Sequence, residues 1–108
     1  MHELAIAESI VTTVLESTDR RVHIVRLQVG RLAGVVPDAL SFSFELAATG
    51  TPLEGAVLEI EECEGRARCR TCATDFALRD AFLLCDCGSA DVELLSGREL
   101  SVKSLEVV

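Results

Sequence analysis

Residues 69–88 read CRTCATDFALRDAFLLCDCG and hold four of the five cysteines of the chain. Cys69 and Cys72 form a CxxC pair, and Cys85 and Cys87 form a tighter CxC pair after twelve intervening residues. Two close pairs can surround one ion tetrahedrally with four thiolates, and zinc is the usual ion for such a set. Four cysteine ligands leave no open position for catalysis, so the pattern predicts a structural zinc site.

The segment around these pairs, residues 65–91, holds few large apolar side chains. A segment of this composition needs a metal to fold, which favours zinc over a set of free buried thiols. Arg66, Arg68 and Arg70 stand beside the first pair. They either offset the negative charge of a zinc–thiolate centre or form an ordinary solvated strand edge. Cys63, which precedes this segment, is expected to pack in the core, and the alternative is that it replaces a badly placed thiolate of the cluster.

The residues before the cysteines predict a helix and two strands. Residues 4–15 are expected to form the helix, because their apolar side chains recur at helical spacing. Residues 22–29 and 56–62 alternate between apolar and polar side chains, which is typical of strands. The apolar positions are Leu4, Ala7, Ile10, Val11, Val14 and Leu15 in the helix, and Val25, Leu27 and Val29 in the first strand.

A second helix is expected to begin at Pro37, because proline suits the first turn of a helix. The sequence Gly-Thr-Pro at 50–52 stops it. Phe42 falls nearly opposite the apolar face of this helix, where it either packs under a loop or contacts a partner. The buried face itself would consist of Leu40, Phe44 and Ala47.

Together these elements predict an α+β fold in which two helices pack on a small three-stranded sheet. The third strand is expected to begin at Leu100. A zinc-ribbon-like module with the four cysteines is inserted before this last strand. The predicted division is therefore an α/β domain, residues 1–64 and 92–108, and a zinc-binding module, residues 65–91.

Composition excludes several classes of protein. The 108 residues are 49% apolar, and 18 acidic against 10 basic residues give a net charge of -8. This charge argues against binding to the phosphates of a nucleic acid. We expect no membrane span and no signal peptide, and clustered cysteines without a signal indicate a cytoplasmic protein. No Ser/His/Asp or Cys/His set is present, so we do not expect an enzyme.

The N-terminus, Met1-His2-Glu3, is a second candidate metal site. The terminal amine, the backbone amide nitrogen and the imidazole of His2 can share one metal, and such donors suit Ni(II) or Cu(II). Glu3 adds a carboxylate on the apolar side of its helix. The alternatives are a frayed terminus for His2 and a favourable helix-dipole position for Glu3. His23 is expected to be a half-buried strand residue.

The sequence resembles the HypA/HybF family of nickel metallochaperones over nearly its whole length. The resemblance rests on MHELAIAESIV at 1–11, LQVGRLAGVVPDALSFSFE at 27–45 and GTPLEGAVLEIEE at 50–62. It continues with RARCRTCATDFAL at 66–78 and CGSADVELLSGRELSVKSLEV at 87–107. The N-terminal sequence followed by the two cysteine pairs is far more specific for this family than either part alone.

The resemblance implies the ligands of two metals. It places nickel at Met1, His2 and Glu3, within the α/β domain, and makes Asp38 an additional nickel ligand. The alternative for Asp38 is to cap or charge the N-terminus of its helix. It makes the four cysteines of the module, Cys69, Cys72, Cys85 and Cys87, the ligands of a structural zinc. This sequence departs from the family at the second pair, which normally is CxxC, so Cys85 is the ligand that the departure affects. Cys63 has no counterpart in the family motif.

The resemblance also implies a function. The protein would carry Ni(II) to [NiFe]-hydrogenase during its maturation, and some members of the family also serve urease. Its partners would be a HypB-like GTPase and the hydrogenase large subunit, and the chain would be a monomer or a homodimer. Two other classes fit the cysteines alone, namely a zinc-ribbon adaptor for protein interactions and a rubredoxin-like iron electron carrier.

Overall fold

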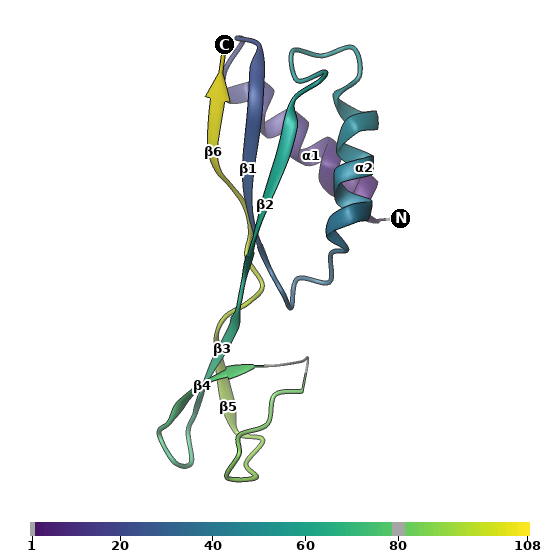
Figure 1. Ribbon diagram of the computed structural model, residues 1–108. Helices are drawn as coiled ribbons and strands as arrows, with labels where there is room; N and C mark the ends of the chain where they lie inside the picture. The colour runs from purple at the N-terminus through teal and green to yellow at the C-terminus, as the bar shows by residue number, and fades with distance from the viewer. Residues whose placement is uncertain (1, 79–81) are drawn as a thin grey trace. The chain divides into compact units, whose positions relative to one another are not determined.

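The computed structural model describes residues 2–78 and 82–108 and confirms the predicted α+β fold (Figure 1). No helix of the described residues is long and apolar enough to cross a membrane. The chain divides into two compact units, Met1–Leu27 with Val35–Glu61 and Ser101–Val108, and Gln28–Gly34 with Glu62–Leu100. The elements are α1 (His2–Ser17), β1 (Val22–Gly30), α2 (Pro37–Ala48), β2 (Val57–Cys63), β3 (Gly65–Cys69), β4 (Asp75–Leu78), β5 (Val92–Ser96) and β6 (Leu100–Val107).

The first unit is a two-layer arrangement of helices on a sheet. The sheet has the order β2-β1-β6, so the strands on either side of the cysteine module lie in one sheet, as predicted. Both helices lie on one side of this sheet and contact each other (Figure 1). The buried side chains between the layers are Ala7, Ile10, Val11, Val14, Val22, Val25, Leu27, Leu40, Phe44, Ala48 and Leu53.

Some predictions of individual side chains were wrong. Ala48 rather than Ala47 completes the buried face of α2, because Leu40, Phe44 and Ala48 follow one another at intervals of four residues. Phe42 packs under no loop of the described chain, since 63% of its surface is exposed. Leu4, placed on the apolar side of the first helix, is 41% exposed. His23 is exposed, not half-buried.

The second unit contains an antiparallel sheet with the order β4-β3-β5. The central strand β3 alternates strictly, with Gly65, Ala67 and Cys69 buried and Arg66 and Arg68 exposed. This unit takes in residues 28–34, 62–64 and 92–100 in addition to residues 65–91. Pairing of β5 with β3 brings in residues 92–96. The division of the chain into a nickel-binding and a zinc-binding part stays a prediction.

A close backbone contact ties residues 30–32 into the second unit. The N–H of Gly30 donates to the carbonyl of Glu99 at 2.7 Å, and the N–H of Leu32 donates to the carbonyl of Gly97 at 2.7 Å. A Cβ at position 30 would lie 2.0 Å from the carbonyl oxygen of Gly97, and Gly97 itself has φ 124°. Glycine is therefore needed at both positions.

We expect Phe44→Ala to destabilise the first unit by about 3–5 kcal/mol, because the change opens a cavity under a ring that is 1% exposed. The matched control is Phe42→Ala, two residues away on the exposed face, which should cost no more than about 0.5 kcal/mol. Urea unfolding followed by the helical circular dichroism signal measures both. Equal costs for the two variants would contradict the assignment of the core.

Candidate metal centres

The four cysteines of the second unit lie together. Their sulfur atoms are all within 4.8 Å of one another. The Cys69–Cys87 and Cys72–Cys85 sulfur pairs are both separated by 3.7 Å. A tetrahedral zinc with bonds of about 2.3 Å would hold its sulfurs about 3.8 Å apart. The donor chemistry and the spacing therefore suit a tetrahedral thiophilic ion such as Zn²⁺.

The first pair is positioned by the turn of the β3–β4 hairpin. The N–H of Cys69 donates to the carbonyl of Thr74 at 2.9 Å, and the N–H of Ala73 donates to the carbonyl of Cys69 at 2.8 Å. Ala73 adopts φ 60°, a left-handed conformation that is uncommon for alanine. This turn directs the N–H of Cys72 toward the sulfur of Cys69, at 3.5 Å.

The second pair reaches a similar arrangement with one residue fewer. The N–H of Gly88 donates to the carbonyl of Cys85 at 2.9 Å, and the N–H of Cys85 donates to the carbonyl of Ser89 at 3.0 Å. Gly88 has φ 90°, and no atom lies within 4 Å of the place where a Cβ would be. Glycine is favoured here by the backbone conformation and not by a lack of space. The shortened turn thus brings the Cys85 sulfur into the cluster, whereas Cys63 is outside it.

A hydroxyl pair connects the two turns. Thr71 Oγ1 and Ser89 Oγ are 2.8 Å apart, and Ser89 Oγ also accepts the N–H of Asp91 at 3.1 Å. The guanidinium of Arg70 binds the Asp91 carboxylate at 3.0 Å. These contacts hold the first turn against the second from outside the sulfur cluster. The hydroxyl pair could not be predicted from the sequence, because the side chains of threonine and serine in turns usually form hydrogen bonds with the nearby backbone.

The three arginines beside the first pair bind carboxylates. Arg66 pairs with Glu64 at 3.4 Å, and Arg68 makes a bidentate contact with Asp75 at 2.6 and 3.1 Å. Arg66 and Arg68 alternate on β3 with the buried residues, which include Cys69. Their side chains therefore lie on the opposite face of the strand from the Cys69 sulfur. Arg66 and Arg68 thus lie on an exposed face of the central strand, which argues against neutralisation of the thiolates and also places these two arginines away from a sheet edge.

The thiols of the cluster differ in acidity. The N–H of Cys72, with that of Thr71, lowers the pKa of the Cys69 thiol to about 6. The N–H of Cys87 lowers the pKa of Cys85, but burial and the neighbouring thiols outweigh it and raise that pKa to about 12. In the metal-free cluster the Cys69 thiol thus loses its proton more readily than the Cys85 thiol.

The N-terminal candidate site is built around Glu3. Its side chain is 9% exposed, whereas that of His2 is 59% exposed. Glu3 Oε2 accepts the N–H of Val36 at 3.3 Å and lies 3.3 Å from His2 Nε2. Val36 is the residue that precedes the first turn of α2, so the carboxylate faces the positive end of that helix. The Val36 N–H, aided by the charge of His2, lowers the pKa of Glu3.

The structure does not bring every candidate nickel ligand together. Met1 lies outside the described residues. Asp38 is exposed in the first turn of α2 and forms no cluster with His2 and Glu3 among the described residues. Sequence reasoning missed the contact of Glu3 with Val36. The available signals were the position of Glu3 on the apolar side of the first helix and the extended residue before Pro37.

A family model described as "Hydrogenase/urease nickel incorporation, metallochaperone, hypA" matches residues 1–107. A hydrogenase maturation factor HypA of Nostoc sp. is 44% identical over 108 residues, which cover 99% of this chain and 96% of the relative. A hydrogenase maturation factor HypA of Streptomyces avermitilis is 50% identical over 112 residues, with 97% and 86% covered.

A solved structure has the same fold. The solution structure of the Ni metallochaperone HypA from Helicobacter pylori superposes with a TM-score of 0.69 and 18% identity. The superposition covers 98% of this chain and 97% of that one.

The contact with Val36 predicts that Glu3 titrates below the ordinary range of a glutamic acid. A lowered pKa in the folded state means that ionised Glu3 stabilises the fold above its unfolded pKa and that this contribution is lost as pH falls through the folded value. Val36→Pro removes the N–H donor and should raise the pKa of Glu3, whereas Val36→Ala keeps the donor and should not. A carbon NMR titration of the Glu3 carboxyl distinguishes them, and identical curves would refute the assignment.

Proposed function

Because the chain belongs to the HypA family of hydrogenase and urease nickel incorporation metallochaperones, we propose that it binds Ni(II) at its own N-terminus and delivers it during maturation of [NiFe]-hydrogenase. Urease maturation is the further role we assign to it in hosts that make that enzyme. The observation that carries the proposal is the buried Glu3 carboxylate, held by Val36 directly beside an exposed imidazole.

In the proposed nickel site, the donors are the Met1 amine, the His2 amide nitrogen and the His2 imidazole. Nε2 of His2 is the ring nitrogen near Glu3 Oε2, at 3.3 Å, so Nδ1 is the ring nitrogen left to close a chelate with the backbone amide. A carboxylate on the distal nitrogen of a metal-bound histidine orients the ring and raises its basicity. In this position Glu3 orients His2 and adds a negative charge beside it, and to serve as a nickel ligand its carboxylate would turn from Nε2 toward the metal. Asp38 is the additional carboxylate that nickel recruits at the start of α2.

The proposed role of the second unit is structural. Cys69, Cys72, Cys85 and Cys87 would hold one Zn²⁺, which supplies the cross-link that this part of the chain needs to fold. Four thiolates leave zinc no open position, so nickel chemistry belongs to the other site. In this scheme residues 1–64 and 92–108 carry the nickel function, and residues 65–91 carry the zinc function.

Delivery requires a site that gives up its metal. Nitrogen and oxygen donors on an exposed terminus can exchange one by one with the donors of an acceptor protein. Protonation of the imidazole and the amine removes donors, so nickel is held less tightly as pH falls. We assign the chain a HypB-like GTPase and the hydrogenase large subunit as partners and the cytoplasm as its location. It acts as a carrier rather than an enzyme, either as a monomer or as a homodimer.

The zinc assignment predicts one tightly held zinc per chain. Cys72→Ser and Cys85→Ser should each lose it, because each removes one sulfur of the cluster. Cys63→Ser is the matched control and should keep one zinc, since Cys63 lies outside the cluster. Metal analysis after dialysis against a weak chelator measures the stoichiometry. Retention of zinc by Cys85→Ser would exclude that ligand, and iron in a red protein would favour the electron carrier instead.

The nickel assignment predicts one Ni(II) per chain in the untagged protein with its native Met1. Loss of a residue that only orients a metal ligand weakens metal binding about 10–100-fold. His2→Ala should weaken nickel binding by more than this, because it removes a ligand. His23→Ala is the matched control, since His23 is an exposed imidazole in β1. Calorimetric titration at constant pH compares the three proteins.

Equal nickel binding by the wild type and His2→Ala would overturn the nickel assignment. Zinc binding without nickel binding that depends on His2 would then favour a zinc-ribbon adaptor.

A further inference from the structure

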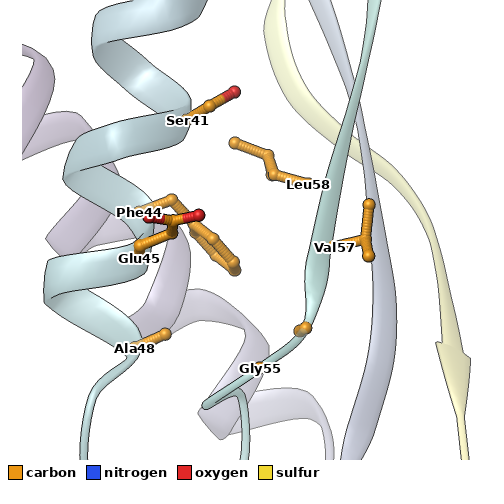
Figure 2. A pocket seen from close by; sticks show the side chains of 8 residues that line it. Ser41, Phe44, Glu45, Ala48, Gly55, Val57 and Leu58 are labelled. Atoms are coloured by element: carbon orange, nitrogen blue, oxygen red, sulfur yellow. The ribbon is translucent and has the colours of Figure 1, made fainter.

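The first unit has a groove between α2 and the start of β2. Its volume is about 460 Å³, and it is lined by Ser41, Phe44, Glu45 and Ala48 on one side and residues 55–58 on the other. The Phe44 ring and the Leu58 side chain point into it from its two walls (Figure 2). Phe44 is buried, whereas Leu58 is only half-buried. The groove therefore has an apolar floor that the chain does not fully cover.

The strand beside the groove lies at the edge of its sheet, because the order is β2-β1-β6. One row of N–H and C=O groups on an edge strand is open to pairing with another strand. Leu58 and Ile60 alternate with exposed Val57 and Glu59, so one face of β2 stays half-buried along the strand. An added strand would extend the sheet beside β2, and its side chains on this face would contact Leu58 and Ile60.

The groove carries a negative charge and no positive one among its lining residues. Glu45 lies on its rim and makes no ion pair within the described part of the chain, whereas Glu59 is bound by Arg26 at 2.9 Å. On α2, Glu45 lies between the groove and two exposed apolar side chains one turn apart, Phe42 and Leu46, which are 63% and 55% exposed. Apolar surface thus flanks a carboxylate on both sides.

We propose that this groove and the free edge of β2 form a docking site for an extended, basic segment of another protein. The segment pairs with β2 as a fourth strand, inserts an apolar side chain between Phe44 and Leu58, and places a lysine or arginine at Glu45. Backbone pairing supplies affinity in this mode, and alternate side chains supply specificity. The inference does not depend on where nickel binds.

A second copy of this chain fits the site less well. The glutamates of β2 are paired within the chain, Glu59 with Arg26, Glu61 with Lys103 and Glu62 with Arg31. The repulsion therefore comes from the net charge of -8 that each copy carries and from Glu45, which makes no ion pair among the described residues. Like charges across a strand pair are destabilising, whereas opposite charges stabilise it. The charge of the groove therefore selects a basic partner.

The probe is a seven-residue peptide with blocked ends that has lysine at its third position, valine at its first, fifth and seventh positions, and threonine at the even positions. Lysine and valine then point to the same side of an added strand, as the proposal requires. This lysine–valine peptide is added to the ¹⁵N-labelled, zinc-loaded full chain. We expect amide shifts confined to residues 41–48 and 55–61, and slowed hydrogen exchange at outward amides of β2. A peptide with proline at its centre should bind about tenfold more weakly, because it loses a donor to the strand pairing. A glutamate–valine peptide should not bind.

Variants of the chain distinguish binding in the groove from nonspecific electrostatic attraction of the peptide. Glu45→Lys should weaken binding of the lysine–valine peptide about tenfold. Glu16→Lys, an equal charge change at an exposed position of α1, should change it less than about twofold. Ser41→Trp fills the groove and should abolish binding while the helical signal is kept. Nickel titration of the same variants should be unchanged, which separates a failure here from a failure of the nickel assignment.

Three results would overturn the proposal. Equal weakening by Glu45→Lys and Glu16→Lys would show attraction to net charge only. Protection of the β2 amides in the free protein, together with a dimer in sedimentation, would identify a second copy as the occupant. Absence of shifts at millimolar lysine–valine peptide would show that the groove accepts no strand.

Discussion

The second unit depends on the meeting of four sulfur atoms within 4.8 Å. Two of these cysteines, Cys69 and Cys85, are themselves among its few buried side chains, beside Val29, Ala67 and Leu78. So small a set of apolar residues cannot provide the burial that a stable core requires. The two turns bring the sulfur atoms together, and the Thr71–Ser89 hydroxyl pair connects the turns from outside the cluster.

The first unit has a hydrophobic core, and this core contains one buried carboxylate among its described residues. Glu3 is a carboxylate with little exposed surface in a layer of apolar side chains. Its burial is tolerated because the Val36 N–H and the positive end of α2 stabilise the ionised form. The result is an exposed imidazole 3.3 Å from a carboxylate that has little exposed surface, and the proposed nickel site rests on this pair.

Much of this fold follows from local patterns. Helical spacing of apolar residues located α1, alternation located β1 and β2, and Pro37 marked the start of α2. The wrong predictions concern the burial of single side chains, which depends on the segments that pack against them. Phe42 and Leu4 are apolar, but no described segment covers either fully, and a sequence pattern carries no information about uncovered surface. Pairing of β5 with β3 likewise depends on contacts between segments that are far apart in the chain.

The sequence by itself determined the family, the two helices, and the identity and spacing of the thiols, because periodicity and short motifs act over a few neighbouring residues. Only the tertiary structure decided that the shortened second turn still brings Cys85 to the cluster. It also decided that Val36 holds Glu3 and that an acidic apolar groove borders an edge strand. These features join residues more than ten positions apart, and their geometry is set by packing of whole elements rather than by any local preference.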